Sequence, residues 1–355
     1  MPTDLTGGID PSREYVFAER PENPEMRDSV SFWTLDDQGR IGLPRIGIEA
    51  VAANWDNHEL QINIAFPDGR VYRLRDGGAS LPPQGPDGKP AVLGAGGLAF
   101  RCVEPFKTWT MTYDGKAVQT SSADLVAGRT GGPLVDVAIV VEATMAVPPW
   151  IQGALQRDAA EQIKKSVEGD LMGGPRYEQL FRARGSVTIG GQTQDFTGSG
   201  LRIRRQGVRK LAEFWGHAWQ SALFPSGKAF GYIAYPPRPD GQPTFNEGYL
   251  FTGDGGLIPA RAVQAPWLTK LQDLGEDVSV VLETAEGTVR IDGETVFSTH
   301  DIHHNDNTFS VREMKKENPN FPALQQAGVR YRWDGEETYG MLERSNPIEK
   351  IDLGS

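Results

Sequence analysis

Short apolar runs alternate with polar turn sequences over most of the chain. Runs such as VSFWTL (30–35), ELQINIAF (59–66) and DVSVVLET (277–284) are separated by stretches rich in Gly, Pro, Asp and Asn. ELQINIAF alternates apolar and polar residues, which is typical of a strand with one buried face. About eight such runs precede Pro148, enough to close a barrel or a strongly curved sheet. The pattern therefore predicts a mostly β fold.

One segment, residues 148–174, breaks this pattern. Its apolar residues recur at a spacing near four, at Ile151, Leu155, Ala159, Ile163 and Val167. Prolines stand at its start and glycines at its end, where helices typically begin and stop. We predict one helix here, and its simplest role is that of a connector lying over a barrel.

The two halves of the chain share turn signatures in the same order. FPDGRVY (66–72) corresponds to FPSGKAF (224–230), and YDG (113–115) corresponds to IDG (291–293). Pro and Gly favour turns wherever they occur, so either match alone can arise from turn chemistry. Together they favour a duplicated β-barrel module. The predicted organisation is an N-terminal arm (1–28), a first barrel (29–147), the connector helix (148–174), a second barrel (175–347) and a tail (348–355).

Composition narrows the classes of partner. The net charge of −11 argues against nucleic acid as a main partner, because phosphate binding needs a basic surface. The single cysteine, Cys102, excludes an internal disulfide and argues against a cysteine-based metal site. The N-terminal residues lack the apolar core of an export signal, and no run approaches the ~20 apolar residues that span a membrane. We therefore expect a soluble, cytoplasmic protein, and the sequence is compatible with a homodimer.

The densest group of candidate functional residues lies between Leu201 and Phe230. A strand here would place Trp215, His217 and Trp219 on one face, because strand side chains alternate with period two. A histidine with an unperturbed pKa near 6.5 is suited to give or take a proton at neutral pH. The alternative is a buried histidine that only forms hydrogen bonds, with the two tryptophans packed in the core.

The arginine-rich strand LRIRRQG adds a second candidate feature. Arg202 and Arg204 share one face of a regular strand and Arg205 lies on the other. An arginine that points into a barrel needs a carboxylate or a substrate oxyanion, because a buried unpaired charge is costly. A carboxylic acid in an apolar cavity also has a raised pKa and can deliver a proton. The candidate carboxylates are Glu178, Asp195 and Glu247, and the candidate orienting hydroxyls are those of Tyr177 and Tyr249; each of these residues can instead be exposed, salt-bridged or structural.

A metal site and a nucleotide site are both disfavoured. Residues 300–306, HDIHHND, have the right side chains for a metal ion, but Asn and Asp at this density also favour a turn. GAGG (94–97) lacks the following helix that a phosphate-binding loop requires. We expect no cofactor.

The order of the motifs resembles the tandem lipocalin-like family that includes carotenoid 1,2-hydratase (hydroxyneurosporene synthase) and the AttH-type proteins. The resemblance rests on FWTLDDQGRIGL, GLAFRCVEPFKTWTMTYDG, a proline-led helix, GSVTIGG, the arginine-rich strand, HAW (217–219) and VRYRWDGEETYGMLERS, from about Ser29 to Ser345. It implies two lipocalin-like antiparallel β-barrels in tandem, with a ligand cavity in or between them. It also implies apolar substrates such as isoprenoids and proton-driven addition or removal of water.

This chain departs from the family pattern at the histidine. Relatives often place a basic and an acidic residue around the histidine of His-x-Trp and a glycine after the tryptophan, whereas Gly216 and Gln220 flank the motif here. We therefore place the proton source on another strand or on His217 itself.

Two hypotheses follow. The first is a cofactor-independent lyase or isomerase of the hydratase or dehydratase type that acts on a hydrophobic, terpenoid-like or aromatic small molecule. Its expected catalytic residues are His217, Glu247 and Asp195, and its expected substrate-binding residues are Trp215, Trp219, Arg202, Arg204, Arg205, Tyr177, Glu178 and Tyr249. The second is a non-catalytic carrier of a hydrophobic ligand, which a wholly apolar cavity would favour.

Overall fold

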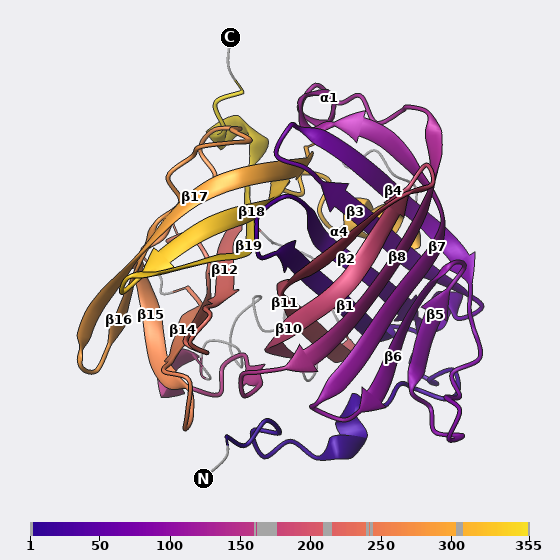
Figure 1. The fold of residues 1–355 in the computed structure, drawn as a ribbon, viewed down its shortest axis with the longest axis horizontal. Coiled ribbons are helices and arrows are strands. Elements are labelled where there is room, and N and C mark those ends of the chain that lie inside the picture. Colours follow the sequence, from indigo (N-terminus) through magenta and orange to yellow (C-terminus); the bar gives the residue numbers. More distant parts are fainter. Residues whose placement is uncertain are drawn as a thin grey trace.

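The computed structural model describes residues 3–159, 161, 176–208, 215–238, 241, 244–302 and 308–353. Strands dominate the chain, as predicted, and they form two antiparallel β units that lie side by side (Figure 1). No helix among these residues is long and apolar enough to cross a membrane. The described helices are short: the 3₁₀ helices η1 (Pro11–Glu14), η2 (Ala52–Asn54) and η3 (Ile348–Lys350), and the α-helices α1 (Ser122–Val126) and α4 (Phe309–Glu317).

The first unit is an eleven-stranded sheet with the strand order β4-β3-β2-β1-β11-β10-β8-β7-β6-β5, to which β9 is added through β10. It curves so strongly that β4 also pairs with the far half of β7, from Arg70 opposite Ser121 to Arg73 opposite Val118. Its strands are β1 (Met26–Asp36), β2 (Gly42–Val51), β3 (Asn57–Ala65), β4 (Arg70–Ala79), β5 (Val92–Ala95), β6 (Leu98–Glu104), β7 (Thr108–Ser121), β8 (Leu134–Met145), β9 (Trp150–Ile151), β10 (Arg176–Ile189) and β11 (Gln192–Val208).

The second barrel is closed and its strands follow one another in sequence order. Closure comes from the pairing of β12 with β19, in which His217 lies opposite Ser345 and Trp219 lies opposite Glu343. Closing a sheet removes its exposed edges, which stabilises a chain that is rich in short strands. Its strands are β12 (His217–Leu223), β13 (Ala229–Ala234), β14 (Asn246–Phe251), β15 (Ile258–Gln264), β16 (Val280–Thr284), β17 (Gly287–Asp301), β18 (Ala323–Trp333) and β19 (Glu336–Asn346).

The strands after residue 175 differ from the expected organisation. The sequence pattern assigned residues 175–208 to the second barrel, but β10 and β11 pair with β8 and β1 in the first unit.

The segment for which a helix over 148–174 was predicted also differs from the expectation. Trp150–Ile151 form β9 on β10, and helical residues appear only at 157–159 and 161; residue 160 and residues 162–174 lie outside the described part of the chain.

The FPDG and FPSG signatures occupy equivalent hairpins, whereas YDG and IDG lie within the strands β7 and β17 and form no turn. The amide of Phe66 donates to the carbonyl of Arg70 at 3.0 Å, and the amide of Phe224 donates to the carbonyl of Lys228 at 2.8 Å. These hairpins join β3 to β4 in the first unit and β12 to β13 in the second barrel. The shared sequence therefore corresponds to a shared local structure, while the two units around it differ in strand number.

Alternation along the strands divides the buried apolar residues into three layers. Val30 and Phe32 of β1 point into the first unit, whereas Trp33 and Leu35 point towards the second barrel. The same alternation in β12 directs Ala218 and Ala222 into the second barrel, and Trp219 and Leu223 towards the first unit. The two units therefore share a third apolar layer between them.

The ring of Phe297 on β17 fills the space beside two glycines in this layer, Gly42 of β2 and Gly328 of β18. A Cβ atom added to Gly42 of β2 would lie 2.0 Å from Cζ of Phe297, and one added to Gly328 of β18 would lie 2.2 Å from the same atom. Glycine is thus required at both positions because the ring occupies the space of a side chain.

We predict that Gly328→Ala lowers the free energy of unfolding by about 1–3 kcal/mol, because the added methyl group forces Phe297 out of its site. Gly256→Ala is the control, since nothing lies within 4 Å of a Cβ atom at that position. Urea denaturation of both variants measures the difference. Equal stability of the two variants would contradict the requirement for glycine beside Phe297.

Candidate active site between the two β units

A cavity of about 260 Å³ lies between the two units, against the outer face of each rather than inside either. Its first wall comes from β1, β2, β3, β4, β10 and β11, and its second wall from β12, β13, β17, β18, β19 and α4. The wall on the first unit is hollow because Ser29, Ser31 and Gly47 bring only small side chains to this face. A Cβ atom on Gly47 would lie 2.9 Å from that of Ser31. Small residues at paired positions thus create the space that a ligand needs.

His217 and Glu343 form an acid–base pair in this cavity. Both side chains line it, and Nε2 of His217 lies 3.3 Å from Oε1 of Glu343. Nδ1 of His217 is 2.7 Å from the hydroxyl of Ser345, the residue directly opposite it on β19. Both ring nitrogens are therefore held, which fixes the orientation of the imidazole.

Arg45 reaches the same carboxylate from the first unit. Its Nη1 donates to Oε1 and Oε2 of Glu343 at 2.9 and 2.8 Å. Arg45 can contact Glu343 because it lies in a β-bulge. The register between β2 and β3 shifts between Gly42 and Gly47, and Arg45 has a φ of 56°. A positive φ is strained for a side-chain-bearing residue, and bulges of this kind re-aim side chains near functional sites.

The bulge has its own support. Nδ2 of Asn63 on β3 donates to the carbonyl of Pro44 at 2.6 Å and to Oε1 of Gln326 at 3.2 Å. Gln326 in turn donates to Oε2 of Glu343 at 2.7 Å. The bulge of β2 and the carboxylate of Glu343 thus belong to one hydrogen-bond network that spans the two units.

The charge state of Glu343 follows from these contacts. Burial by itself would raise the pKa of Glu343, but the Arg45 guanidinium and the hydrogen bonds from His217 and Gln326 outweigh it and hold the pKa well below its usual range. Glu343 is therefore ionised at neutral pH, and it faces Nε2 of His217 as an anion. This is the arrangement of a general acid held by a fixed anion.

Trp219 forms the aromatic part of the second wall. Its Nε1 donates to Oε2 of Glu178 at 3.0 Å, and the guanidinium of Arg176 lies 5.0 Å from its ring centroid. Glu178 is buried behind this ring and also accepts from Nε2 of Gln152 at 2.8 Å. Burial raises the pKa of Glu178 despite the opposing effect of Arg176. The pKa values of Glu178 and Glu343 are thus shifted in opposite directions by their surroundings, a pattern typical of acid–base sites.

The structure brings His217, Trp219 and Arg205 together in the cavity lining. The predicted shared face of His217 and Trp219 exists, but it is the outer face of the second barrel, because the interior is filled by its own side chains. Inside, the hydroxyl of Tyr232 donates to Oε1 of Gln220 at 2.7 Å. Trp215 precedes β12 and packs on Tyr235 with ring centroids 5.9 Å apart.

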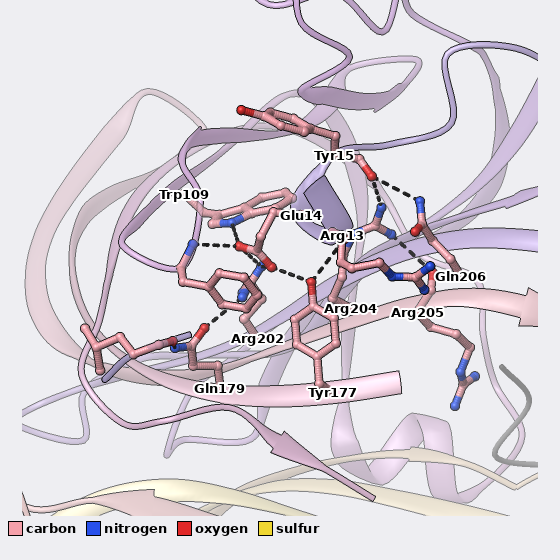
Figure 2. Close-up of polar contacts among 12 residues, drawn as sticks. Arg13, Glu14, Tyr15, Trp109, Tyr177, Gln179, Arg202, Arg204, Arg205 and Gln206 are labelled. Carbon is pink, nitrogen blue, oxygen red and sulfur yellow. Dashed lines mark hydrogen bonds and ion pairs between the residues drawn. The ribbon is translucent and has the colours of Figure 1, made fainter. Parts of the chain in front are cut away.

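Arg202, Arg204 and Tyr177 lie on the opposite side of their strands, inside the first unit. The period-two prediction for the arginines is confirmed, since Arg205 alone of the three lines the cavity. Figure 2 shows the Arg205 side chain pointing away from the network that contains Arg202 and Arg204. Their partners are Glu14 and Asp28 from the N-terminal part of the chain, rather than the expected Glu178, Asp195 or Glu247.

Glu14 is the centre of the network that Figure 2 shows. Nη1 of Arg202 donates to its two carboxylate oxygens at 2.7 and 2.8 Å, and Nε1 of Trp109 donates at 2.8 Å. The hydroxyl of Tyr177 donates to the same carboxylate, and Nη2 of Arg202 donates to Oε1 of Gln179 at 2.8 Å. A buried network of this kind anchors the N-terminal arm inside the first unit.

Glu247, Tyr249 and Asp195 lie outside the cavity lining. Glu247 accepts hydrogen bonds from Nε1 of Trp150 at 2.8 Å and from the amides of residues 153, 155 and 156. Tyr249 packs edge-on against Trp150 with centroids 5.6 Å apart. These two residues therefore hold the segment after β9 against β14. Asp195 is exposed near the far end of β11.

The histidine-rich stretch falls partly outside the described residues, which omit 303–307. Nε2 of His300 lies 2.8 Å from Oδ1 of Asp273, and Asp301 pairs with Arg73 at 2.7 Å across the two units. Among the residues that the structure describes, no group of three His, Cys, Asp or Glu side chains is arranged to hold a metal ion.

The functional residues that sequence reasoning missed are Glu343, Arg45 and Gln326. Each lies on a strand of unremarkable polarity, and Arg45 and Glu343 are 298 positions apart. The motif LERS (342–345) was among the family signatures, and period-two alternation from it would have placed Glu343 and Ser345 on one face.

Comparisons with known proteins agree with this fold. The model of a family described as "Domain of unknown function (DUF7064)" matches residues 10–348. An AttH-type protein from Nitrosomonas europaea superimposes with a TM-score of 0.55 at 12% identity, covering 94% of this chain and 99% of that one. CghA in complex with Sch210972 superimposes with a TM-score of 0.52 at 12% identity, covering 94% and 90%. No protein of curated function matches the sequence.

Proposed function

We propose that this chain, which belongs to the DUF7064 family, is a cofactor-independent lyase or isomerase of the hydratase or dehydratase type. Its substrate is a hydrophobic small molecule that binds in the cavity between the first unit and the second barrel. The observation that carries the proposal is His217, held by the ionised Glu343 in the lining of that cavity. A carrier would be favoured by a wholly apolar cavity, whereas this lining contains a paired acid and base.

The chemistry needs one proton donor that also takes the proton back. In hydration, protonated His217 gives its proton to one alkene carbon and the other carbon becomes cationic. A water molecule attacks that carbon, a C–O bond forms, and neutral His217 accepts the proton that water releases. Dehydration is the reverse sequence. Glu343 stabilises the imidazolium state throughout, and the face of Trp219 is suited to stabilise positive charge on carbon.

The first test identifies the substrate and the reaction. Mass spectrometry of small molecules that co-purify with the protein selects candidate compounds, which are then incubated with the protein in isotopically labelled water. Incorporation or loss of labelled oxygen shows hydration or dehydration. An isomerase of the same mechanism would exchange hydrogen with solvent and leave the oxygen content unchanged.

We predict that His217→Gln lowers turnover of the identified substrate by about 10²–10⁴-fold, the usual contribution of a general acid–base group. The matched control is His58→Gln, because His58 is a buried histidine of β3 outside the cavity lining. Steady-state kinetics of both variants decide the point. Turnover by His217→Gln equal to that of His58→Gln would remove His217 from the mechanism.

A further inference from the structure

The two walls of the cavity differ in chemistry, and this difference carries an inference about the substrate. The wall on the first unit presents hydroxyl, amide and charged side chains, among them Ser29, Ser31, Gln61 and Arg205. Its apolar neighbours Val30, Ile48 and Leu60 belong to the core inside the first unit, so their side chains point away. Apart from Ile203 of β11, which faces the layer between the units, this wall is therefore mainly polar.

The opposite wall is mainly apolar. Trp219 and Ile233 of the second barrel contribute to it, and Val311 and Met314 of α4 continue it, three positions apart on one helix face. All four belong to, or pack against, the apolar layer between the units. The acid–base pair of His217 and Glu343 lies on this second wall, beside the apolar surface.

The described lining contains as many arginines as carboxyl side chains. Its basic side chains are Arg45, Arg75, Arg176 and Arg205, and its acidic side chains are Glu49, Glu59, Asp301 and Glu343. Arg45 pairs with Glu343 and Arg176 pairs with Glu178, so these arginines already have anionic partners. A site built for an anion needs an excess of permanent positive charge, which the arginines of this lining do not supply.

We infer that the substrate is a neutral, polyoxygenated molecule with an apolar or aromatic face and several hydroxyl or carbonyl groups along its other edge. The apolar face would lie on Trp219 and Ile233, and the oxygens would meet the wall of Ser29, Ser31 and Gln61. A hydrocarbon would leave this polar wall desolvated and unpaired, which is costly for binding. This inference rests on the proposed function only for the location of the site.

The test uses three ligands that share one skeleton: trans-stilbene, resveratrol with its three hydroxyl groups, and a stilbene carboxylate. Isothermal titration calorimetry of the full chain gives the three affinities. We expect resveratrol to bind about tenfold or more tightly than each of the others, since its hydroxyl groups can form hydrogen bonds with the polar wall. Equal affinities, tighter binding of the carboxylate, or no measurable binding of resveratrol would overturn the inference.

A variant pair assigns the preference to the polar wall. Gln61→Met removes the amide and keeps the side-chain length, so resveratrol should bind several-fold more weakly while trans-stilbene is unaffected. Gln194→Met makes the same change on β11 outside the cavity lining and should leave both affinities unchanged. Loss of resveratrol affinity in both variants, or in neither, would count against the polar wall.

The two proposals fail separately. The affinities are measured without turnover. A His217→Gln variant with unchanged turnover would therefore contradict the proposed reaction, while calorimetry would still decide the ligand preference. Conversely, a hydrocarbon or anion preference combined with an inactive His217→Gln variant would overturn the inference and support the proposed function.

Discussion

Glu14→Gln lowers the free energy of unfolding by about 3–5 kcal/mol, the typical cost of leaving one partner of a buried ion pair uncompensated. Glu14 and Arg202 are both 0% exposed, so the charge that remains on Arg202 has no access to water. Trp109 and Tyr177 lose their anionic acceptor in the same step. Urea denaturation followed by tryptophan fluorescence at neutral pH measures the loss.

The control is the same substitution on an exposed pair. Glu104 accepts from Lys107 in an ion pair whose side chains are 54% and 64% exposed, so Glu104→Gln should cost less than about 1 kcal/mol. If the two variants lost equal stability, the network inside the first unit would have no special role.

Acid provides an independent check on the same residue. Burial alone would raise the pKa of Glu14, but Arg202 and the hydrogen bonds from Tyr177 and the Phe106 amide lower it below the ordinary value of 4.5. A carboxyl whose folded-state pKa is depressed stabilises the fold above the unfolded pKa, and this stabilisation is lost as pH falls through the folded pKa. The stability gap between the wild type and Glu14→Gln should therefore be full at neutral pH and shrink below about pH 4.5.

Glu343→Gln should lower kcat by about 10²–10⁴-fold, because the proposed proton donor His217 loses its fixed anion. The variant keeps the shape of the side chain but leaves the cation of Arg45 without a carboxylate. We expect KM and ligand affinity to change little, because the substitution slows the chemical step and not the binding of substrate. Glu343→Asp retains the charge and should recover part of the lost turnover.

Glu49→Gln is the matched control for Glu343→Gln. Glu49 also lines the cavity, on β2 of the first unit, and it forms an ion pair with Arg27 at 3.0 Å. This variant should stay within about tenfold of wild-type turnover. A parallel fall of kcat and ligand affinity in Glu343→Gln would assign Glu343 a purely structural role.

The alternation within single strands could be predicted, but not which of the two faces lies inside a unit. Along β11 the last ten residues before Val208 are buried on both faces, because one face lines the first unit and the other packs towards the second barrel. Polarity therefore did not distinguish the two sides, and the salt-bridged arginines occupy the interior. The shared face of His217 and Trp219 could likewise be predicted, but not that it is the outer face of the second barrel.

Long-range pairing accounts for the remaining differences. No local signal shows that Glu14 from the N-terminal arm inserts beside Arg202, or that β11 pairs with β1. Arg45 reaches Glu343 only because a bulge turns its backbone to a positive φ, and the residues around it give no sequence cue for this. Sequence order and turn chemistry sufficed for the β class and the hairpins, because both depend on neighbouring residues.

The pairing of β1 with β11 has a consequence for how the chain folds. The first unit cannot complete its sheet until residues 192–208 are available, since Met26 lies opposite Val208 and Arg202 must find Glu14 across 188 positions. Among the described residues, the second barrel pairs strands that are neighbours in sequence, and its one long-range pairing joins β12 to β19. Loop closure slows long-range pairing, so we expect the C-terminal barrel to form quickly and the N-terminal unit to be rate-limiting. During synthesis, the part of the chain made first would then be the last to reach its native state.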